Sequence, residues 1–257
     1  MHSDTAHLRL RQVSVAYGGT TAVAPLDLDI GHNEFVSLVG TSGCGKSTLL
    51  GVVAGLVTPT TGTVTLGAQH VRGPGRDRGM VFQKYTLFPW MTALQNVEFA
   101  LRDQPGLSRA ERRAQAADLL TQVGLGDRAD AHPDQLSGGM QQRVAIARAL
   151  SYRPEVLLMD EPFGALDALT RRVMQDLLTG LWERHRLTVL FVTHDIEEAV
   201  YLSDRVLVMS GTPGRVRREI TVPLSRPRRR DLTSDDGFRS ACAEAYEAIY
   251  ATPEAGA

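Results

Sequence analysis

The feature of this sequence that most constrains its fold is a glycine-rich loop at residues 40–48, which has the spacing G-x-x-x-x-G-K-S-T. The mostly apolar run at residues 35–39, Phe-Val-Ser-Leu-Val, predicts a short buried strand before the loop. Residues 47–56 predict a helix after it, ended by Thr58 and Pro59. In such a unit, glycines let backbone N–H groups converge on an anion at the positive end of the helix dipole. The loop therefore predicts a phosphate-binding site on an α/β core.

Two side chains of this loop have specific tasks in phosphate binding. Lys46 is expected to reach the β- and γ-phosphates of a nucleotide, and the hydroxyl of Ser47 is expected to bind Mg²⁺. A chance glycine-rich turn is disfavoured, because only Lys46 and Lys84 among the 28 basic residues are lysines. We expect Cys44 to fill space rather than to take part in chemistry. The residues expected to bind a nucleoside triphosphate are Gly40, Thr41, Ser42, Gly43, Cys44, Gly45, Lys46, Ser47 and Thr48.

An acidic pair follows a second apolar run. Residues 156–159 are continuously apolar, which suits a strand buried on both faces of a parallel sheet. Asp160 and Glu161 then stand at the carboxyl end of that strand, where α/β sheets place their ligands. Asp160 is expected to hold Mg²⁺, and Glu161 is the candidate general base that polarises the attacking water. Acidic strand ends are usually just solvated, so this interpretation depends on its pairing with the phosphate loop.

A second glycine-rich loop, at residues 136–141, has the sequence Leu-Ser-Gly-Gly-Met-Gln and leads into another helix-like stretch. Taken alone, this loop could be an ordinary turn and helix cap. Two such loops in one chain, together with the acidic pair, favour an ATPase in which two subunits enclose the nucleotide.

In this order, the motifs resemble those of the ATP-binding subunit of ATP-binding-cassette (ABC) transporters, from Tyr17 to His194. Residues 136–140 resemble the signature that separates cassette ATPases from kinases, GTPases and helicases. Met140 departs from the commoner glutamine of that signature. ATP-driven dimerisation is expected to survive, because backbone N–H groups and the Ser137 hydroxyl would contact the phosphate. The further matches are Gln83 for the Q-loop, residues 165–167 for the D-loop, His194 for the switch histidine and Tyr17 for the adenine-stacking aromatic.

The resemblance implies three groups of site residues and the cofactors ATP and Mg²⁺. The catalytic group consists of Glu161, His194 and Gln83. The implied metal ligands are Ser47, Gln83 and Asp160. The implied nucleotide contacts outside the first loop are Tyr17, Ser137, Gly138, Gly139 and Asp167, the signature residues acting on the nucleotide of the opposite subunit.

Two of these residues have ordinary alternatives. His194 follows an apolar strand at residues 189–192, and we expect it to lie beside the strand of Asp160 and to contact the γ-phosphate. A lone loop histidine is more often a satisfied structural residue. Tyr17 follows a strand-like run at residues 8–15, and aromatic residues at strand ends usually just pack.

The segment 83–96 carries information about a partner. Phe88 and Trp90 lie beside polar residues, with Pro89 blocking a continued helix. These side chains could tuck into the protein. In the family this segment lines the groove that receives a cytoplasmic helix of the membrane subunit, and both are residue types that anchor interfaces. The resemblance thus implies transmembrane permease subunits as partners, with Gln83 coupling the γ-phosphate to the groove.

Composition limits the compartment and the partners. Cys44 and Cys242 have no metal-like spacing and indicate no disulfide framework. Residues 1–4 lack the apolar core of a signal peptide, and no apolar run approaches about 18 residues. We therefore expect no segment to cross a membrane, and the resemblance then implies a peripheral subunit at the cytoplasmic face of the cell membrane. A formal net charge of −1 gives no reason to expect nucleic-acid binding.

The expected architecture is an α/β P-loop NTPase core, in which helices flank a mostly parallel sheet, with an antiparallel β flank and an inserted helical subdomain. The whole chain is expected to form one ABC ATPase domain. Its expected parts are a core at about 1–95 and 152–215, a helical signature subdomain at about 96–151, and a tail with a helix at about 216–257.

Individual elements follow from local patterns. Alternation predicts antiparallel strands at residues 8–10, 13–15 and 26–30, with a further short strand at 64–66. A capping box at Ser108 opens a helix through Val123, and Gly124 is its expected stop. The later elements expected are a helix at 168–184 and strands at 156–160, 189–193 and 206–209.

The tail contains a basic run and then a helix. Arg226, Arg228, Arg229 and Arg230 are expected to form a solvated surface, with contact to anionic lipid headgroups as the alternative. The helix is expected to place Phe238, Cys242, Ala245 and Ile249 on one face.

The solute is only weakly indicated. Residues 73–83, 88–90 and 167–171 resemble the nitrate/sulfonate/taurine group of bacterial importers, but none of them touches the solute. The expected function is uptake of a small solute, an anion such as nitrate, alkanesulfonate or taurine, delivered by a periplasmic or lipid-anchored solute-binding protein. The cassettes are expected to pair, as a homodimer or with another cassette. Alternatives are an importer of another small molecule, a non-transport cassette ATPase and a nucleotide-binding regulator, although a regulator would not need Glu161 and His194.

Overall fold

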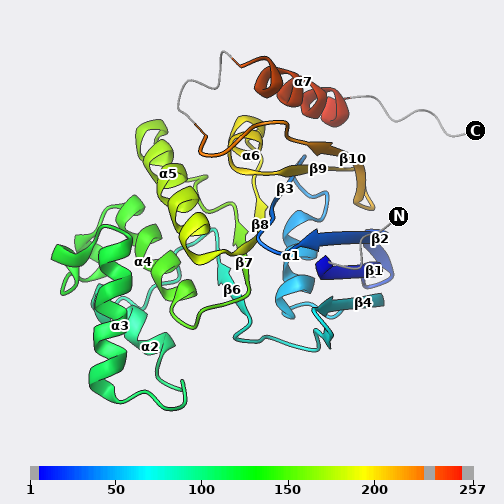
Figure 1. Cartoon of the computed structure of the whole chain (residues 1–257). Coiled ribbons are helices and arrows are strands. Elements are labelled where there is room, and N and C mark those ends of the chain that lie inside the picture. Colours follow the sequence, from blue (N-terminus) through cyan, green and yellow to red (C-terminus); the bar gives the residue numbers. More distant parts are fainter. Residues whose placement is uncertain (1–5, 229–234, 251–257) are drawn as a thin grey trace, which may run out of the picture. The chain divides into compact units, whose positions relative to one another are not determined.

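A computed structural model describes residues 6–228 and 235–250 of the chain (Figure 1). The chain divides into two compact units. The first contains the described residues up to Pro74 and those from Thr188 onward, and the second is Gly75–Leu187. The expectations for residues 1–4, Arg229 and Arg230 fall outside the described residues.

An antiparallel sheet forms one part of the first unit. Its strands, in spatial order, are β2 (Thr20–Gly31), β1 (Ala6–Tyr17), β4 (Thr61–Leu66) and β5 (Gln69–His70). Apolar side chains on one face of β1, such as Leu8, Leu10 and Val13, are fully buried. The predicted antiparallel flank is therefore confirmed, because alternating apolar residues cover the core while polar residues face water.

Parallel strands form the other sheet of this unit. Its strands are β8 (Thr188–Val192), β3 (Phe35–Gly40) and β9 (Arg205–Ser210), with β10 (Arg215–Thr221) antiparallel at the edge beside β9. Every residue of β3 is buried, and Leu38 lies opposite both Val192 of β8 and Leu207 of β9. The carboxyl end of β3 thus delivers the glycine-rich loop to the edge of the sheet where α/β proteins bind ligands. β10 was not expected from the sequence.

The helices of the first unit are α1 (Lys46–Ala54), α6 (Ile196–Leu202) and α7 (Asp236–Tyr250). The predicted end of α1 at residue 56 is wrong. Gly55 adopts φ 74° and the backbone N–H of Leu56 donates to Gly51, which closes the helix two residues earlier.

The predicted apolar face of α7 is confirmed. Phe238, Cys242 and Ala245 are buried in a cluster with residues of α6, β9 and β10, and Ile249 packs at its border. Figure 1 shows α7 lying over α6 and β10.

The second unit contains a parallel strand pair and most of the helices. Strand β6 (Arg78–Val81) pairs with β7 (Val156–Asp160). The helices are α2 (Ala93–Ala100), α3 (Arg109–Gln122), α4 (Gly138–Leu150) and α5 (Ala168–His185), with short 3₁₀ turns at Gly126–Arg128 and Pro133–Gln135. The capping box at Ser108 and the stop near Gly124 are confirmed.

The expectation of a solvated tail is wrong for Arg226 and Arg228. Their side chains are 16% and 1% exposed. Both guanidinium groups are drawn inward because they donate to backbone carbonyls at the carboxyl end of α6. Across residues 6–228 and 235–250, no helix has the length and apolar character needed to cross a bilayer.

Candidate nucleotide-binding site

The glycine-rich loop joins β3 to α1 in the first unit. Gly45 is the N-cap residue of α1 and adopts φ 90°. A Cβ atom at this position would come within 2.7 Å of Val23 Cγ2, so both the backbone conformation and the close approach of β2 require glycine. Within the described residues no side chain caps this helix, and no acidic residue occupies its first turn. An uncapped helix start with converging N–H groups suits an anionic ligand such as phosphate.

Lys46 is held against the loop that it belongs to. Its Nζ atom donates to the carbonyl oxygens of Gly40 (2.8 Å) and Thr41 (3.0 Å), and the residue is only 5% exposed. Cys44 is 1% exposed, with Sγ 4.0 Å from that Nζ. The ammonium group is therefore fixed within the loop.

His194 lies at the same edge of the sheet as this loop. The backbone N–H of Thr193 donates to Leu38 of β3 (3.2 Å), two residues before the loop begins. Thr193 Oγ1 donates to Glu198 Oε2 (2.6 Å) and accepts from the backbone N–H of Asp195 (3.0 Å). Hydrogen bonds to β3 and to α6 therefore hold the turn that carries the exposed His194.

Tyr17 ends β1 and is 54% exposed. It pairs with Thr20 at the start of β2, and β2 passes the glycine-rich loop where Val23 approaches Gly45. An exposed aromatic ring on this hairpin has the character needed to stack on a nucleobase.

In the second unit, β6 and β7 bring Gln83 and Asp160 to one edge. Val81 lies opposite Met159, and both strands run in the same direction, so the residues that follow leave the sheet on the same side. Glu161 has φ 42°, a left-handed conformation that costs a non-glycine residue roughly 1–3 kcal/mol and is common at active sites.

The signature loop starts α4. Ser137 is the N-cap residue, and its Oγ accepts from the backbone N–H of Met140 (3.3 Å). A serine hydroxyl that accepts one bond can still donate to another group. Gly138 is the first residue of the helix, and a Cβ at Gly139 would lie 2.6 Å from Thr170 Cγ2.

Thr170 also connects the signature to the D-loop. Asp167 caps α5 and accepts from the backbone N–H groups of Leu169 (3.1 Å) and Thr170 (3.0 Å), and from Thr170 Oγ1 (2.7 Å). The bonds from Thr170 lower the pKa of Asp167 below its usual value and favour the carboxylate. Sequence reasoning missed Thr170, because only the fold brings it against the signature.

Asn96 organises the segment that follows Gln83. This fully buried side chain donates from Nδ2 to the carbonyls of Phe88 (3.2 Å), Met91 (3.1 Å) and Thr92 (3.0 Å), and its Oδ1 accepts from Phe88 N–H (2.8 Å). Arg148 of α4 donates to Thr86 O (2.8 Å) and lies 6.0 Å above the Phe88 ring. The segment is thus a fixed structure attached to the signature helix.

The two aromatic residues of this segment have different environments. Phe88 is half-buried against Phe99, with ring centroids 4.8 Å apart, whereas Trp90 is 69% exposed. The alternative that these side chains pack into the protein therefore holds for Phe88 but not for Trp90. A groove of about 600 Å³ opens here, lined by Trp90, Met91, Gln95, Glu98, Phe99, Arg102, Arg109 and Arg112.

The predicted site residues are divided between the two units. The first unit brings together the loop at 40–48, Tyr17 and His194. The second unit carries Gln83, Asp160, Glu161, the signature residues and Asp167.

Comparison with known proteins defines the class. A family model described as ABC transporter matches residues 23–164. The chain belongs to this family as an ATP-binding, ATP-hydrolysing cassette, and the predicted family and fold class are confirmed.

Named relatives refine this assignment. The nitrate import ATP-binding protein NrtD of Synechocystis sp. is 54% identical over 207 residues, covering 80% of this chain and 77% of the relative. The bicarbonate transport ATP-binding protein CmpD of Synechocystis sp. is 48% identical over 238 residues, covering 90% and 84%. Among solved structures, a dimeric post-hydrolysis state of the ATP-binding cassette MJ0796 bound to ADP and Pi is similar at 37% identity and a TM-score of 0.74. That match covers 85% of this chain and 100% of the other.

Proposed function

We propose that this chain is the ATP-hydrolysing subunit of an importer that takes up a small anion. The observation that carries the proposal is the sequence identity of this chain to two named transport proteins, 54% to NrtD and 48% to CmpD. The name of NrtD refers to nitrate import and that of CmpD to bicarbonate transport. The motif resemblance adds alkanesulfonates and taurine to the candidates. In the full complex, a solute-binding protein would deliver the anion, and this chain would act at the cytoplasmic face of the membrane.

The triphosphate would be held by the loop at 40–48. Backbone N–H groups at the uncapped start of α1 would surround the β-phosphate, and Lys46 would exchange its bonds to loop carbonyls for bonds to the β- and γ-phosphates. Tyr17 would stack on the adenine.

The donor set fits Mg²⁺. Ser47, Gln83 and Asp160 offer hydroxyl, amide and carboxylate oxygens, the hard ligands that this ion prefers. Mg²⁺ usually keeps several waters and binds substrate phosphates, so it would complete its shell with phosphate oxygens and water. The bound ion would neutralise charge on the β- and γ-phosphates.

Hydrolysis would depend on Glu161. Its carboxylate accepts a proton from water while the water oxygen attacks the γ-phosphorus, and the bond to the bridging oxygen of ADP breaks. ADP and inorganic phosphate leave. His194 and Gln83 would contact the γ-phosphate and orient the attacking water.

Two copies would enclose the nucleotides. The similarity to the dimeric MJ0796 cassette supports this arrangement. The start of α4 in one copy, with Ser137, Gly138 and Gly139, would bind the γ-phosphate held by the loop of the other. Asp167 would lie next to this contact through Thr170. Closure on ATP and reopening after hydrolysis would switch the access of the membrane subunits.

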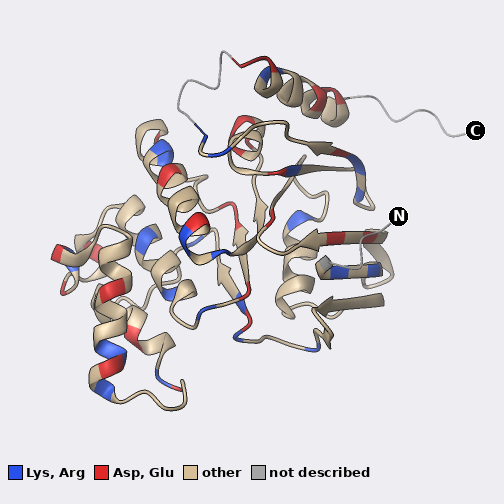
Figure 2. Ribbon diagram, viewed as in Figure 1, with Lys and Arg blue, Asp and Glu red and all other residues tan. Residues whose placement is uncertain are grey.

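The groove at Trp90 would receive the membrane subunit. Arg102, Arg109 and Arg112 outnumber Glu98 along its lining, and Figure 2 shows basic residues in the N-terminal turns of α3. We therefore expect a short permease helix with an apolar face and at least one acidic residue.

Trp90→Ala is expected to weaken binding to the permease about 30-fold or more, because a truncated tryptophan hot spot costs at least about 2 kcal/mol. Affinity for ATP should stay within about twofold of wild type, since this side chain does not face the nucleotide loop in our proposal. Co-purification from detergent, together with ATP titration of the isolated chain, measures both. Tyr250→Ala, which removes an equally exposed aromatic residue on α7, is the matched control. Unchanged assembly of Trp90→Ala would contradict the assignment.

Uptake by a deletion strain tests the function itself. Loss of the gene should abolish uptake of one labelled anion among nitrate, bicarbonate, taurine and alkanesulfonates. The wild-type chain should restore it, and Glu161→Gln should not. If the deletion strain still took up all four anions, the proposal of an anion importer would be refuted. The remaining candidates would be an importer of another small molecule or a non-transport ATPase.

A further inference from the structure

We propose that Arg228 is a positioning residue for His194 and acts through helix α6. The proposal rests on the proposed role of His194 at the γ-phosphate. It concerns the tail arginine that sequence reasoning expected on the solvated surface.

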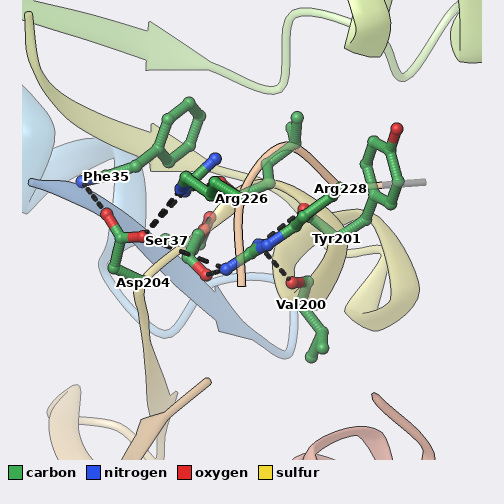
Figure 3. A network of polar contacts seen from close by, with 9 residues as sticks. Phe35, Ser37, Val200, Tyr201, Asp204, Arg226 and Arg228 are labelled. Carbon is green, nitrogen blue, oxygen red and sulfur yellow. Dashed lines mark hydrogen bonds and ion pairs between the residues drawn. The ribbon is translucent and has the colours of Figure 1, made fainter. Parts of the chain in front are cut away.

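Arg228 binds the carboxyl end of α6 (Figure 3). Its Nη1 donates to the carbonyls of Val200 (2.8 Å) and Tyr201 (2.6 Å), and its Nη2 donates to that of Ser203 (2.6 Å). The last carbonyls of a helix have no partner within the helix, so a cation inserted there satisfies them and opposes the helix dipole.

Arg226 completes this cap. It donates to Leu202 O (2.7 Å) and to Asp204 Oδ1 (2.8 Å from Nη2). The other oxygen of Asp204 accepts from the backbone N–H of Phe35 (2.9 Å), the first residue of β3. Two tail side chains therefore hold four successive carbonyls, and Asp204 connects them to the start of the strand that leads to the phosphate loop.

The other end of α6 carries the candidate catalytic histidine. Asp195 caps the helix directly after His194, and its side chain accepts from Glu198 N–H (3.0 Å). The helix has only 7 residues, and so short a helix is not stable by itself. Apolar packing of Ala199 and Val200 holds the body of the helix, and the bonds at its two ends hold the rest. Loosening the Arg228 end is therefore expected to shift the turn at His194.

The burial of Arg228 favours this role over simple attachment of the tail. Apolar contacts of Phe238, Ala241 and Ala245 already attach α7 to the core. Burial lowers the pKa of Arg228 to about 10, so the guanidinium stays charged at neutral pH. A buried cation is unfavourable unless its partners are well placed. Here those partners are the carbonyls at the carboxyl end of α6 and, at 3.9 Å, the carboxylate of Asp204.

A double-mutant cycle between Arg228→Met and His194→Ala in the full chain tests the proposal. Arg228→Met should lower kcat roughly tenfold, because small displacements of a catalytic group have large effects on rate. The dissociation constant for ATP should stay within about twofold, and the loss should disappear in the His194→Ala background. Arg228→Lys, which keeps a cation with several donors, should recover most of the rate. Arg218→Met is the control, because the ion pair of Arg218 is with Glu244 on α7, at 2.6 Å.

The outcomes of the cycle distinguish a positioning role of Arg228 from a general structural effect. Equal losses in both backgrounds would show a general structural effect and overturn the proposal. An unchanged kcat in Arg228→Met, with a large loss in His194→Ala, would overturn this inference alone. If His194→Ala kept the wild-type kcat, His194 would have no role in hydrolysis, and this inference would be refuted as well. If Arg228→Met does not fold, Arg226→Met replaces it in the cycle, with the same expected loss of kcat and the same dependence on His194.

Discussion

Glu161→Gln is expected to bind ATP with nearly wild-type affinity and to hydrolyse it on the order of 10²–10⁴ times more slowly, the usual contribution of a general base. The amide has the shape of the carboxylate but cannot accept the proton of the attacking water. Single-turnover release of inorganic phosphate measures the chemical step, and titration with ATP measures affinity.

The matched control is Glu183→Gln, which makes the same change on the exposed surface of α5 and should turn over normally. If Glu161→Gln released phosphate at the wild-type rate, the base would have to be another group. The positive φ of Glu161 makes the isosteric change preferable to alanine, because the backbone strain stays the same in both proteins.

Lys46→Met is expected to lower ATP affinity by roughly 10- to 100-fold, because a hydrogen bond to a charged group contributes about 1.5–3 kcal/mol. Methionine keeps most of the volume of the buried side chain while removing the ammonium group. Calorimetric titration with ATP measures the change.

The sequence offers a matched control for this experiment. Lys84, the other lysine of the chain, is exposed, and Lys84→Met should leave affinity unchanged. Wild-type affinity of Lys46→Met would show that the loop does not bind the triphosphate through this residue.

Elements with local signals could be predicted from the sequence. The phosphate loop is recognisable because phosphate binding requires glycines, a lysine and a hydroxyl at fixed spacing next to a strand and a helix. The helix after Ser108 is equally local, since its capping box and its glycine stop both lie within or beside it. Strand β7 could be predicted from a continuous apolar run, and strand β3 from a run interrupted only by Ser37.

Elements that depend on distant partners could not be predicted in this way. β10 has the sequence RVRREIT, and it becomes a strand because β9 offers an open edge. β6 has only 4 residues and begins with Arg78, which pairs with Asp77 at 2.6 Å. Helices α2 and α6, by contrast, carry local capping signals, Thr92 with Gln95 and Asp195 with Glu198.

The site shows the same division. Loop residues could be named because each motif is contiguous. Thr170 and Arg148 instead act through contacts with residues far away in sequence. Asn96 bonds to backbone groups only four to eight positions earlier, which no sequence motif marks. A run of arginines is usually solvated, and nothing near Arg228 in sequence reveals the carbonyls more than 20 positions earlier that bind it.

Sedimentation of Glu161→Gln with saturating Mg-ATP most directly tests the claim that ATP joins two copies across the signature. We expect a particle of twice the 28.0 kDa chain mass with Mg-ATP and a single chain without nucleotide. Gly139 lies at the start of α4, and a valine side chain there would collide with Thr170 of α5. Adding Gly139→Val should therefore abolish the pairing while ATP still binds. A Glu161→Gln protein that stays a single chain at saturating Mg-ATP, alone and with its permease, would contradict the account.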